Sequence, residues 1–320
     1  MQISISTGNG STLVPVIPGI GGLEAVYEDI RRGRIAEGLE DLFADLSDRR
    51  EDPSEAWPEF ARGCLGHPLR RFLHQDPFTY RAFSKPRGYA GDAVMMDYIY
   101  GLGEASTAAR GATPLGRAIF AHMSTRPSAC AVRYRRRLLA GLIDSTASRG
   151  GDSVFALAAG HIREVELSGA VQNRQITRFV AMDQDTASLA VVARDYARQG
   201  ISAVAGSVRD ILSGKARPGT FDFVYAAGLF DYLGAPVATA LTCKLFEMTR
   251  PGGLLLIPNF KTGASDAGYM ESFMDWHLIY RNHDDMRALA AALPGATVAG
   301  FDVFDDDHDT ITFLLVSKAL

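Results

Sequence analysis

The chain has 320 residues, of which 47% are hydrophobic and 22% are charged, and its formal net charge is −4. This composition is typical of a globular protein with one large or two modest domains, and the weakly acidic balance argues against nucleic acid as a partner. No apolar run approaches the roughly 20 residues that span a bilayer, so we expect no membrane span. The N-terminal segment lacks a basic region followed by an apolar core, so we expect no secretory signal and a cytoplasmic location.

The first 150 residues predict a loose arm followed by helices. Residues 1–18 are rich in Gly, Ser and Pro, which predicts a flexible arm. Apolar residues at helical spacing predict helices over residues 22–48, after Pro58 and over residues 115–145. We expect an interruption at Gly33 and a break near Pro127. The segment therefore predicts a helical N-terminal domain and lid over residues 19–148.

After Gly150, short β-rich runs alternate with helical patterns, which implies a parallel sheet covered on both faces. The predicted strands span residues 153–157, 178–182, 201–205, 221–227 and 253–258. Two further β-like runs, joined by the acidic turn Asp305–Asp309, predict an antiparallel hairpin. We therefore predict an α/β, doubly wound, mostly parallel seven-stranded sheet with a C-terminal antiparallel hairpin. We expect this sheet to form a Rossmann-like domain over residues 149–320. A parallel α/β sheet that ends in an antiparallel hairpin is typical of class I methyltransferases.

Small and acidic residues stand where a nucleotide-type cofactor would approach this sheet. The turn after the first strand, LAAGHIREVE, offers Ala158 and Gly160 for close backbone approach. Asp183 ends the second strand, where an acidic side chain accepts hydrogen bonds from ribose hydroxyls. An ordinary strand-to-helix turn is the alternative for the first motif, and Asp185 is expected to cap the next helix. Further cofactor candidates are Glu164 and Gln184.

The third and fourth segments, GSVRDIL and FDFVYAAGLFDYL, continue this pattern. Residues after the third strand commonly lie against the adenine ring, and the candidates there are Val208, Arg209 and Asp210. The fourth strand runs into a small-residue turn, Ala227 and Gly228, whose exit is expected to face the sulfur and methyl group of the cofactor. Asp231 and Tyr232 are predicted to line the substrate pocket. Together the four segments predict an enzyme that transfers a methyl group from S-adenosylmethionine.

The chain also resembles a known family of class I S-adenosylmethionine-dependent methyltransferases, which acts in the biosynthesis of extracellular factor 3-hydroxypalmitic acid methyl ester. The resemblance is carried by LAAGHIREVE, MDQD, GSVRDIL, AGLFDYL, YMESFMDWHLIYR and the upstream YRAFSKPRGYAGDAVMMDYIYG. It implies S-adenosyl-L-methionine as cofactor, a carboxyl or hydroxyl acceptor, and a role in small-molecule biosynthesis such as secondary metabolism. Family members tend to have a more glycine-rich first turn, from which Ala158 and His161 depart.

The upstream segment KPRGYAGDAVMMD is dense in special residues and is predicted to form a lid over the cofactor. Tyr89 and Asp92 are candidates for cofactor binding, with Asp92 holding the cofactor ammonium group. Arg87 is predicted to bind a carboxylate of the cofactor or of the substrate. A connector whose charges face water is the alternative.

Residues 269–285 follow the fifth strand, where class I enzymes place a substrate-binding insertion. The predicted substrate-binding residues are Arg87, Tyr232, Asn259, Trp276, Tyr280 and Arg281, and the catalytic candidates are Asp231, Glu271 and His277. As a helix, this segment would place Glu271 beside Asp275. Core packing of Trp276 and Tyr280 is the alternative.

The acceptor decides which residues the reaction needs, because the sulfonium is already activated and the protein mainly orients the reactants and excludes water. A carboxylate acceptor needs a cation such as Arg87, and a guanidinium needs carboxylates such as Glu271 and Asp231. A hydroxyl acceptor needs a base such as His277 or His161. N-methylation of a guanidino or amino group, as on free arginine, is the alternative activity. A non-catalytic regulator that binds an adenosyl ligand is the alternative of another class.

The remaining signals concern cysteines, metals and assembly. The three cysteines Cys64, Cys130 and Cys243 are far apart, which argues against a disulfide framework and favours a reducing compartment. The seven histidines lack metal-ligating spacing, so we predict no metal. The basic run over residues 133–137 is expected to be solvated or to pair with acids. The sequence leaves a homodimer open as the assembly.

Overall fold

The computed structural model describes residues 21–54 and 56–320, and the arm predicted over residues 1–18 lies outside the described residues. The chain forms two compact units, each discontinuous in sequence. Within the described residues, a helical unit comprises 21–90, 101–126 and 265–277, and a sheet unit comprises 91–100, 127–264 and 278–320. Segments on both sides of the predicted boundary at residues 148–149 contribute to each unit, and the predicted domain ranges stay predictions.

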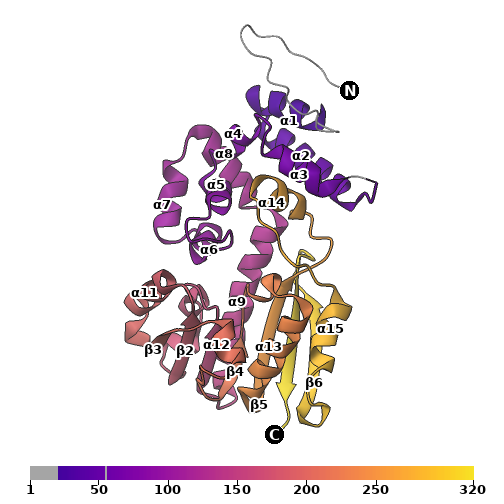
Figure 1. Cartoon of the computed structure of the whole chain (residues 1–320). Coiled ribbons are helices and arrows are strands. Elements are labelled where there is room, and N and C mark those ends of the chain that lie inside the picture. Colours follow the sequence, from indigo (N-terminus) through magenta and orange to yellow (C-terminus); the bar gives the residue numbers. More distant parts are fainter. Residues whose placement is uncertain (1–20, 55) are drawn as a thin grey trace. The chain divides into compact units, whose positions relative to one another are not determined.

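The sheet unit is built on a seven-stranded sheet with the order β3-β2-β1-β4-β5-β7-β6 (Figure 1). Its strands are β1 (Ser153–Leu157), β2 (Arg178–Asp183), β3 (Ile201–Ala205), β4 (Phe221–Tyr225), β5 (Thr249–Phe260), β6 (Val298–Asp305) and β7 (Ile311–Lys318). Strands β1 to β5 pair in parallel, and β7 pairs antiparallel with both β5 and β6. The predicted fold class is therefore confirmed, including the C-terminal hairpin.

Helices cover both faces of this sheet. The α-helices of the sheet unit are α6 (Ala93–Tyr100), α9 (Pro127–Ser148), α10 (Gly169–Gln172), α11 (Thr186–Asp195), α12 (Val208–Leu212), α13 (Ala235–Glu247) and α15 (His283–Ala291). Short 3₁₀ helices are η1 (Arg163–Glu166), η2 (Ala197–Gln199), η3 (Phe230–Tyr232) and η4 (Gly295–Thr297). Figure 1 shows α13 in front of the central strands and α9 behind them.

Alternation along the strands sends successive side chains into two separate cores. On β1, Val154 and Ala156 join the core that contains buried residues of α9, whereas Phe155 and Leu157 join the core that contains residues of α13 and α15. All residues of β1 are buried, which explains why the sequence shows a continuous apolar run there rather than polar alternation.

The helical unit follows the proline and glycine breaks of the sequence. Its helices are α1 (Gly21–Arg31), α2 (Ile35–Glu51), α3 (Trp57–Cys64), α4 (Arg70–Leu73), α5 (Pro77–Ser84), α7 (Gly103–Gly111), α8 (Pro114–Met123) and α14 (Ala267–Phe273). The interruption predicted at Gly33 is confirmed, since α1 ends just before this residue, which has a φ of +85°. The break predicted near Pro127 is confirmed as well, because α8 ends at Met123 and α9 begins at Pro127.

The segment α14 comes from the second half of the chain but belongs to the helical unit. Asp266, just before α14, pairs with Arg126 at 2.9 Å, and Glu271 pairs with Arg50 of α2 at 2.9 Å. Glycine is required within α14, since a Cβ at Gly268 would meet the backbone oxygen of Leu46 at 2.8 Å. Across the described part of the chain, no helix combines the length and apolarity that crossing a bilayer requires.

Candidate functional site

The turn after β1 lies at the carboxyl edge of the sheet and is tightly bent. Ala158, Gly160 and Ile162 all have positive φ, of +50°, +56° and +43°. This conformation is strained for alanine and more so for a β-branched isoleucine, and such strain concentrates at functional sites. A Cβ at Gly160 would meet the Cβ of Ala93 at 3.3 Å, so the turn packs closely against the start of α6.

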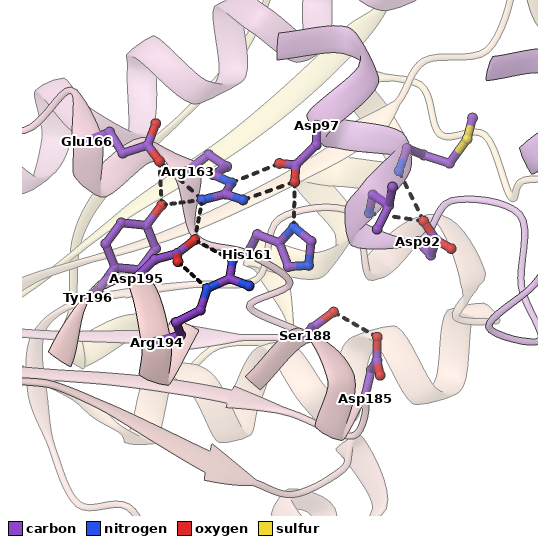
Figure 2. Close-up of polar contacts among 12 residues, drawn as sticks. Asp92, Asp97, His161, Arg163, Glu166, Asp185, Ser188, Arg194, Asp195 and Tyr196 are labelled. Carbon is purple, nitrogen blue, oxygen red and sulfur yellow. Dashed lines mark hydrogen bonds and ion pairs between the residues drawn. The ribbon is translucent and has the colours of Figure 1, made fainter. Parts of the chain in front are cut away.

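Asp183 joins this turn to the end of β2. Its Oδ2 accepts a hydrogen bond from the Gly160 N–H at 2.8 Å, and its Oδ1 accepts one from the Asp185 N–H at 2.8 Å. Asp185 caps α11, as predicted, by accepting a hydrogen bond from the Ala187 N–H. It also accepts one from the Ser188 hydroxyl (Figure 2). The two residues thus have different tasks: Asp185 starts the helix, and the buried Asp183 faces the β1 turn. Gln184, between them, is exposed.

Beside Gly160, His161 forms a buried network with Asp97 and Arg163 (Figure 2). The His161 Nδ1 lies 2.9 Å from Asp97 Oδ2, and Arg163 donates to both oxygens of Asp97, at 2.8 and 3.0 Å. Burial raises the pKa of Asp97, but the hydrogen bonds and charges of His161 and Arg163 outweigh it and leave that pKa below its ordinary value. The His161 Nε2 is buried and has no hydrogen-bond partner among the described residues.

Arg163 extends the network away from the turn. Its Nη1 donates to Asp195 at 3.0 Å and to the Tyr196 hydroxyl at 2.9 Å, and Tyr196 donates to Glu166 at 2.6 Å (Figure 2). These contacts join α6, η1 and the end of α11 behind the β1 turn. Because each charged group in the network has a partner, the network fixes His161 and Arg163 and thereby supports the strained turn beside them.

Glu164, a predicted cofactor residue, has its carboxyl group beside β4. Its Oε1 accepts a short hydrogen bond from the Tyr225 hydroxyl. Burial raises the pKa of Glu164 above its ordinary value, although this hydrogen bond and the positive charges of Arg135 and Arg136 act in the opposite direction. Its predicted role stays a prediction, and in the protein it also links η1 to the central strand.

The residues after β3 form a helix cap. Ser207 and Asp210 make a reciprocal capping box at the start of α12, in which Asp210 accepts from the Ser207 N–H at 3.0 Å and from its hydroxyl at 2.7 Å. These hydrogen bonds lower the pKa of Asp210. Val208 packs partly against the core on the α13 side, and Arg209 is exposed. The adenine contacts predicted for these residues stay predictions.

The exit of β4 is lined by small residues, as its sequence indicates. Ala227 is half-buried, and Gly228 has a φ of +80°. Asp231 follows in η3 and is buried, with its Oδ1 accepting a hydrogen bond from the Phe260 N–H at 2.6 Å. Burial raises the pKa of Asp231 against the effect of that hydrogen bond. Tyr232, in contrast, is exposed.

Two predicted substrate residues, Asn259 and Arg281, contact each other in a buried cluster. Arg281 donates to Asn259 Oδ1 at 2.5 Å and to the carbonyl oxygen of Phe230 at 2.7 Å, and Asn259 donates to the carbonyl of Ile279 at 2.9 Å. They join the returning segment 278–282 to the ends of β4 and β5. Tyr280, in the same segment, packs partly against the core on the α9 side.

Asp92 begins α6 at the amino end of the sheet unit's first segment. It is fully buried, and its Oδ1 accepts hydrogen bonds from the Val94 and Met95 N–H groups, each at 3.0 Å (Figure 2). Asp92 therefore caps α6, which carries Asp97 and packs on the β1 turn. Arg87 and Tyr89 precede it in the helical unit, where both are half-buried, and the lid role of this segment stays a prediction.

The remaining residues that were predicted to bind or activate the methyl acceptor lie in the helical unit. Glu271 accepts hydrogen bonds from Arg50 at 3.1 Å and from the Trp57 indole N–H at 2.6 Å. Helix α14 ends at Phe273, and Asp275 has a φ of +48°, so the predicted helical spacing of Glu271 and Asp275 is not formed. His277 is exposed and lies 3.2 Å from Asp275, whereas Trp276 is buried.

Sequence reasoning missed Asp97 and the burial of Arg135. Asp97 lies in the apolar run VMMDYIY, where a lone acid between large apolar residues is the signal that could have marked it. Arg135 belongs to a basic run that was expected to be solvated or paired, yet it is buried, while Arg136 pairs with Glu166 at 2.6 Å. In the described ranges, no three His, Cys, Asp or Glu side chains gather to hold a metal ion, and the absence of a metal stays a prediction.

Comparison with known proteins gives solved structures alone, since no family model and no curated protein matches the chain. A possible exported protein from Bordetella parapertussis aligns over 87% of this chain and 96% of its own, with a TM-score of 0.58 and 16% identity. The S-adenosylmethionine-dependent methyltransferase SibL aligns over 79% of this chain and 78% of its own, with a TM-score of 0.48 and 14% identity. Magnesium protoporphyrin IX methyltransferase from Synechocystis PCC 6803 aligns over 76% of this chain and 100% of its own, with a TM-score of 0.45 and 9% identity. At these identities the first likeness shows the fold alone.

Proposed function

We propose that this protein is an enzyme that transfers a methyl group from S-adenosylmethionine to a small molecule. One observation carries the proposal: the Gly160 N–H donates to the Asp183 carboxylate at 2.8 Å. This hydrogen bond brings the glycine turn after β1 and the acidic end of β2 together at the carboxyl edge of the sheet. Ligands of open α/β sheets bind at that edge, with an acidic residue on the ribose hydroxyls.

The Asp183 carboxylate retains acceptor capacity for a ribose. Each of its oxygens accepts one backbone N–H, and a carboxylate has about four lone-pair sites in all. When bound, the cofactor supplies an activated methyl group, so the chain's residues need only orient the two reactants and exclude water. The strained β1 turn and the small residues Ala227 and Gly228 at the β4 exit would allow that close approach.

We further propose a carboxyl or hydroxyl acceptor rather than a guanidino group. A guanidinium would need carboxylates that are available to orient and deprotonate it. Of the two carboxylates named for that task, Glu271 is engaged by Arg50 and by the Trp57 indole N–H. The family resemblance to enzymes of 3-hydroxypalmitic acid methyl ester biosynthesis favours the same acceptor class. A cytoplasmic location is part of the proposal, supported by Cys64, Cys130 and Cys243, none of which forms a disulfide within the described residues.

The cofactor claim is tested by Asp183→Ala in the full-length protein. Loss of a carboxylate that accepts ribose hydroxyls removes charge-assisted hydrogen bonds, so the affinity for S-adenosylmethionine should fall by about 10- to 100-fold. Titration calorimetry measures it, and Asp302→Ala, at an exposed position of β6, is the matched control with unchanged affinity. Wild-type protein that binds no S-adenosylmethionine, or binding equally strong in Asp183→Ala, would refute the claim.

Catalysis is tested by product mass analysis after incubation with labelled cofactor and a panel of hydroxy acids, amino acids and arginine. We expect a mass increase of one methyl group on a carboxyl or hydroxyl compound. Methylated arginine would instead support the guanidino alternative. Tight cofactor binding with no turnover on any compound would favour a regulator that binds the adenosyl ligand as a signal.

A further inference from the structure

Arg135 is a buried cation that no carboxylate of the described residues neutralises directly. It lies on α9, its residue is 6% exposed, and its Nη2 donates to the thioether sulfur of Met96 at 3.4 Å. A thioether is a weak acceptor, and the second polar neighbour is the neutral Tyr100 hydroxyl. Among residues 21–54 and 56–320, no Asp or Glu oxygen lies within 4.0 Å of an Arg135 nitrogen. Burial of a charge without a pair is unfavourable, so the site favours an incoming anion.

Two buried acids that feel the charge of Arg135 accept hydrogen bonds from other groups. Glu164 accepts from the Tyr225 hydroxyl, and Asp231 accepts from the Phe260 N–H at 2.6 Å. Burial raises the pKa of each of these carboxyl groups, while the charge of Arg135 lowers each pKa by a smaller amount. Arg135 is therefore within electrostatic reach of both acids but is paired with neither.

The guanidinium lies against the turn that follows β4. A Cβ placed on Gly228 would meet Arg135 Nη1 at 3.5 Å and Nη2 at 3.8 Å. Any larger residue at position 228 would therefore contact the two nitrogens with which an arginine binds a carboxylate side by side. Glycine at this position keeps that edge of the guanidinium clear of a side chain, at the β4 exit where the proposed reaction brings cofactor and acceptor together.

We propose that Arg135 binds a carboxylate of the small molecules that this site takes, either the amino-acid carboxylate of the cofactor or a carboxylate of the acceptor. The proposal rests on the proposed methyltransferase function. A planar guanidinium matches a carboxylate through two parallel hydrogen bonds. A monoanion fits better than a phosphate dianion, because the two acids Glu164 and Asp231 lie within electrostatic reach of Arg135.

The first arm of the test measures melting temperatures of the ligand-free full-length protein. Arg135→Met keeps the apolar stem and removes the unpaired charge, so we expect an unchanged or higher melting temperature. Arg135→Lys keeps the charge without the planar fork, and Arg137→Met, at an exposed position of the same helix, is the matched control. A fall of many degrees in both Arg135 variants would mark Arg135 as structural and overturn the proposal.

The second arm measures binding of S-adenosylmethionine and of its decarboxylated form by calorimetry. If the cofactor supplies the carboxylate, wild type prefers S-adenosylmethionine by about 10- to 100-fold, and Arg135→Met loses that preference without changing affinity for the decarboxylated form. If the acceptor supplies it, Arg135→Met leaves cofactor affinity unchanged. It then raises KM by a similar factor for hydroxy acids but not for their neutral amides.

The outcomes distinguish a failure of the carboxylate role of Arg135 from a failure of the proposed methyltransferase function. Wild-type protein that binds neither form of the cofactor refutes the proposed function. Wild-type protein that binds and methylates, with Arg135→Met unchanged in affinity and in KM, leaves the function standing and refutes the carboxylate role of Arg135. Equal weakening of S-adenosylmethionine and its decarboxylated form would also overturn that role.

Discussion

Gly160 meets two structural requirements of the turn after β1, a left-handed backbone and a backbone hydrogen-bond donor. It adopts a φ of +56°, and its backbone N–H is the donor to Asp183. Ala158 has a φ of +50° in the same turn although it carries a side chain. Left-handed backbone costs an L-residue about 1–2 kcal/mol, so the chain tolerates strain at position 158 and avoids it at the residue that faces α6 and Asp183.

Substitution of Gly160 by alanine should therefore affect both stability and binding. We expect Gly160→Ala to lower the free energy of unfolding by about 1–2 kcal/mol from φ strain, and to weaken S-adenosylmethionine binding by at least about 10-fold. Gly150→Ala is the control, since Gly150 has a φ of +86° with no atom within 4 Å of the added Cβ. It should lose comparable stability while binding remains unchanged. Equal binding in Gly160→Ala and wild type would contradict the role given to this turn.

At the scale of elements, α5 begins at a buried acid that makes the helical unit sensitive to pH. Asp76 caps α5 by accepting hydrogen bonds from the Phe78 N–H at 3.0 Å and the Thr79 N–H at 2.9 Å. Burial raises the pKa of Asp76 from 3.8 to about 6, although these hydrogen bonds lower it. A raised carboxyl pKa means that the folded state holds the proton more tightly than the unfolded chain does.

The sign of the pH dependence follows from this difference. Below pH 3.8 the group is protonated in both states, and as pH rises to about 6 the unfolded chain ionises first. The free energy of unfolding should fall by about 3 kcal/mol across that window and stay level above it. Asp76→Asn, which can still cap the helix, should remove this fall.

Urea unfolding between pH 4 and pH 7, monitored by tryptophan fluorescence, measures this pH dependence of the free energy of unfolding. Both tryptophans, Trp57 and Trp276, lie in the helical unit, so the signal reports on that unit. The comparison of interest is the difference between wild type and Asp76→Asn, with Asp302→Asn as the exposed control. A difference that does not change with pH would rule out a buried, proton-binding Asp76.

The elements themselves were predictable where local chemistry decides them. Short β-rich runs predicted β1 to β5, and β1 is continuously apolar because both of its faces are buried. Gly33 and Pro127 predicted helix breaks because they disfavour helical backbone. The point at which the helix within residues 269–285 ends, and the elements against which it packs, were not predictable in this way. Their aromatic and charged pattern suits a helix, but Asp275 adopts a left-handed conformation, and α14 packs with α2 and α3 in a different unit from the strands before it.

At the scale of the whole molecule, the mostly parallel sheet with its antiparallel C-terminal hairpin was predictable from the sequence, but the contacts that the candidate site residues make were not. Asp183 and Gly160 were expected together because parallel strands end at one edge. Asp97 reaches His161 across 64 residues, and Arg135 is buried only because α9 packs on the sheet core. Such long-range contacts leave no local period in the sequence.

The most direct test of the central claim is a crystal structure of the full chain with S-adenosylhomocysteine. We expect the adenosyl group at the carboxyl edge of β1, β2 and β4, with its ribose hydroxyls within about 2.6–3.2 Å of the Asp183 carboxylate. We also expect the backbone of Ala158 to Gly160 to be in van der Waals contact with the ligand. A ligand bound away from Gly160 and Asp183, or a well-ordered crystal soaked to saturation with that site unfilled, would contradict it.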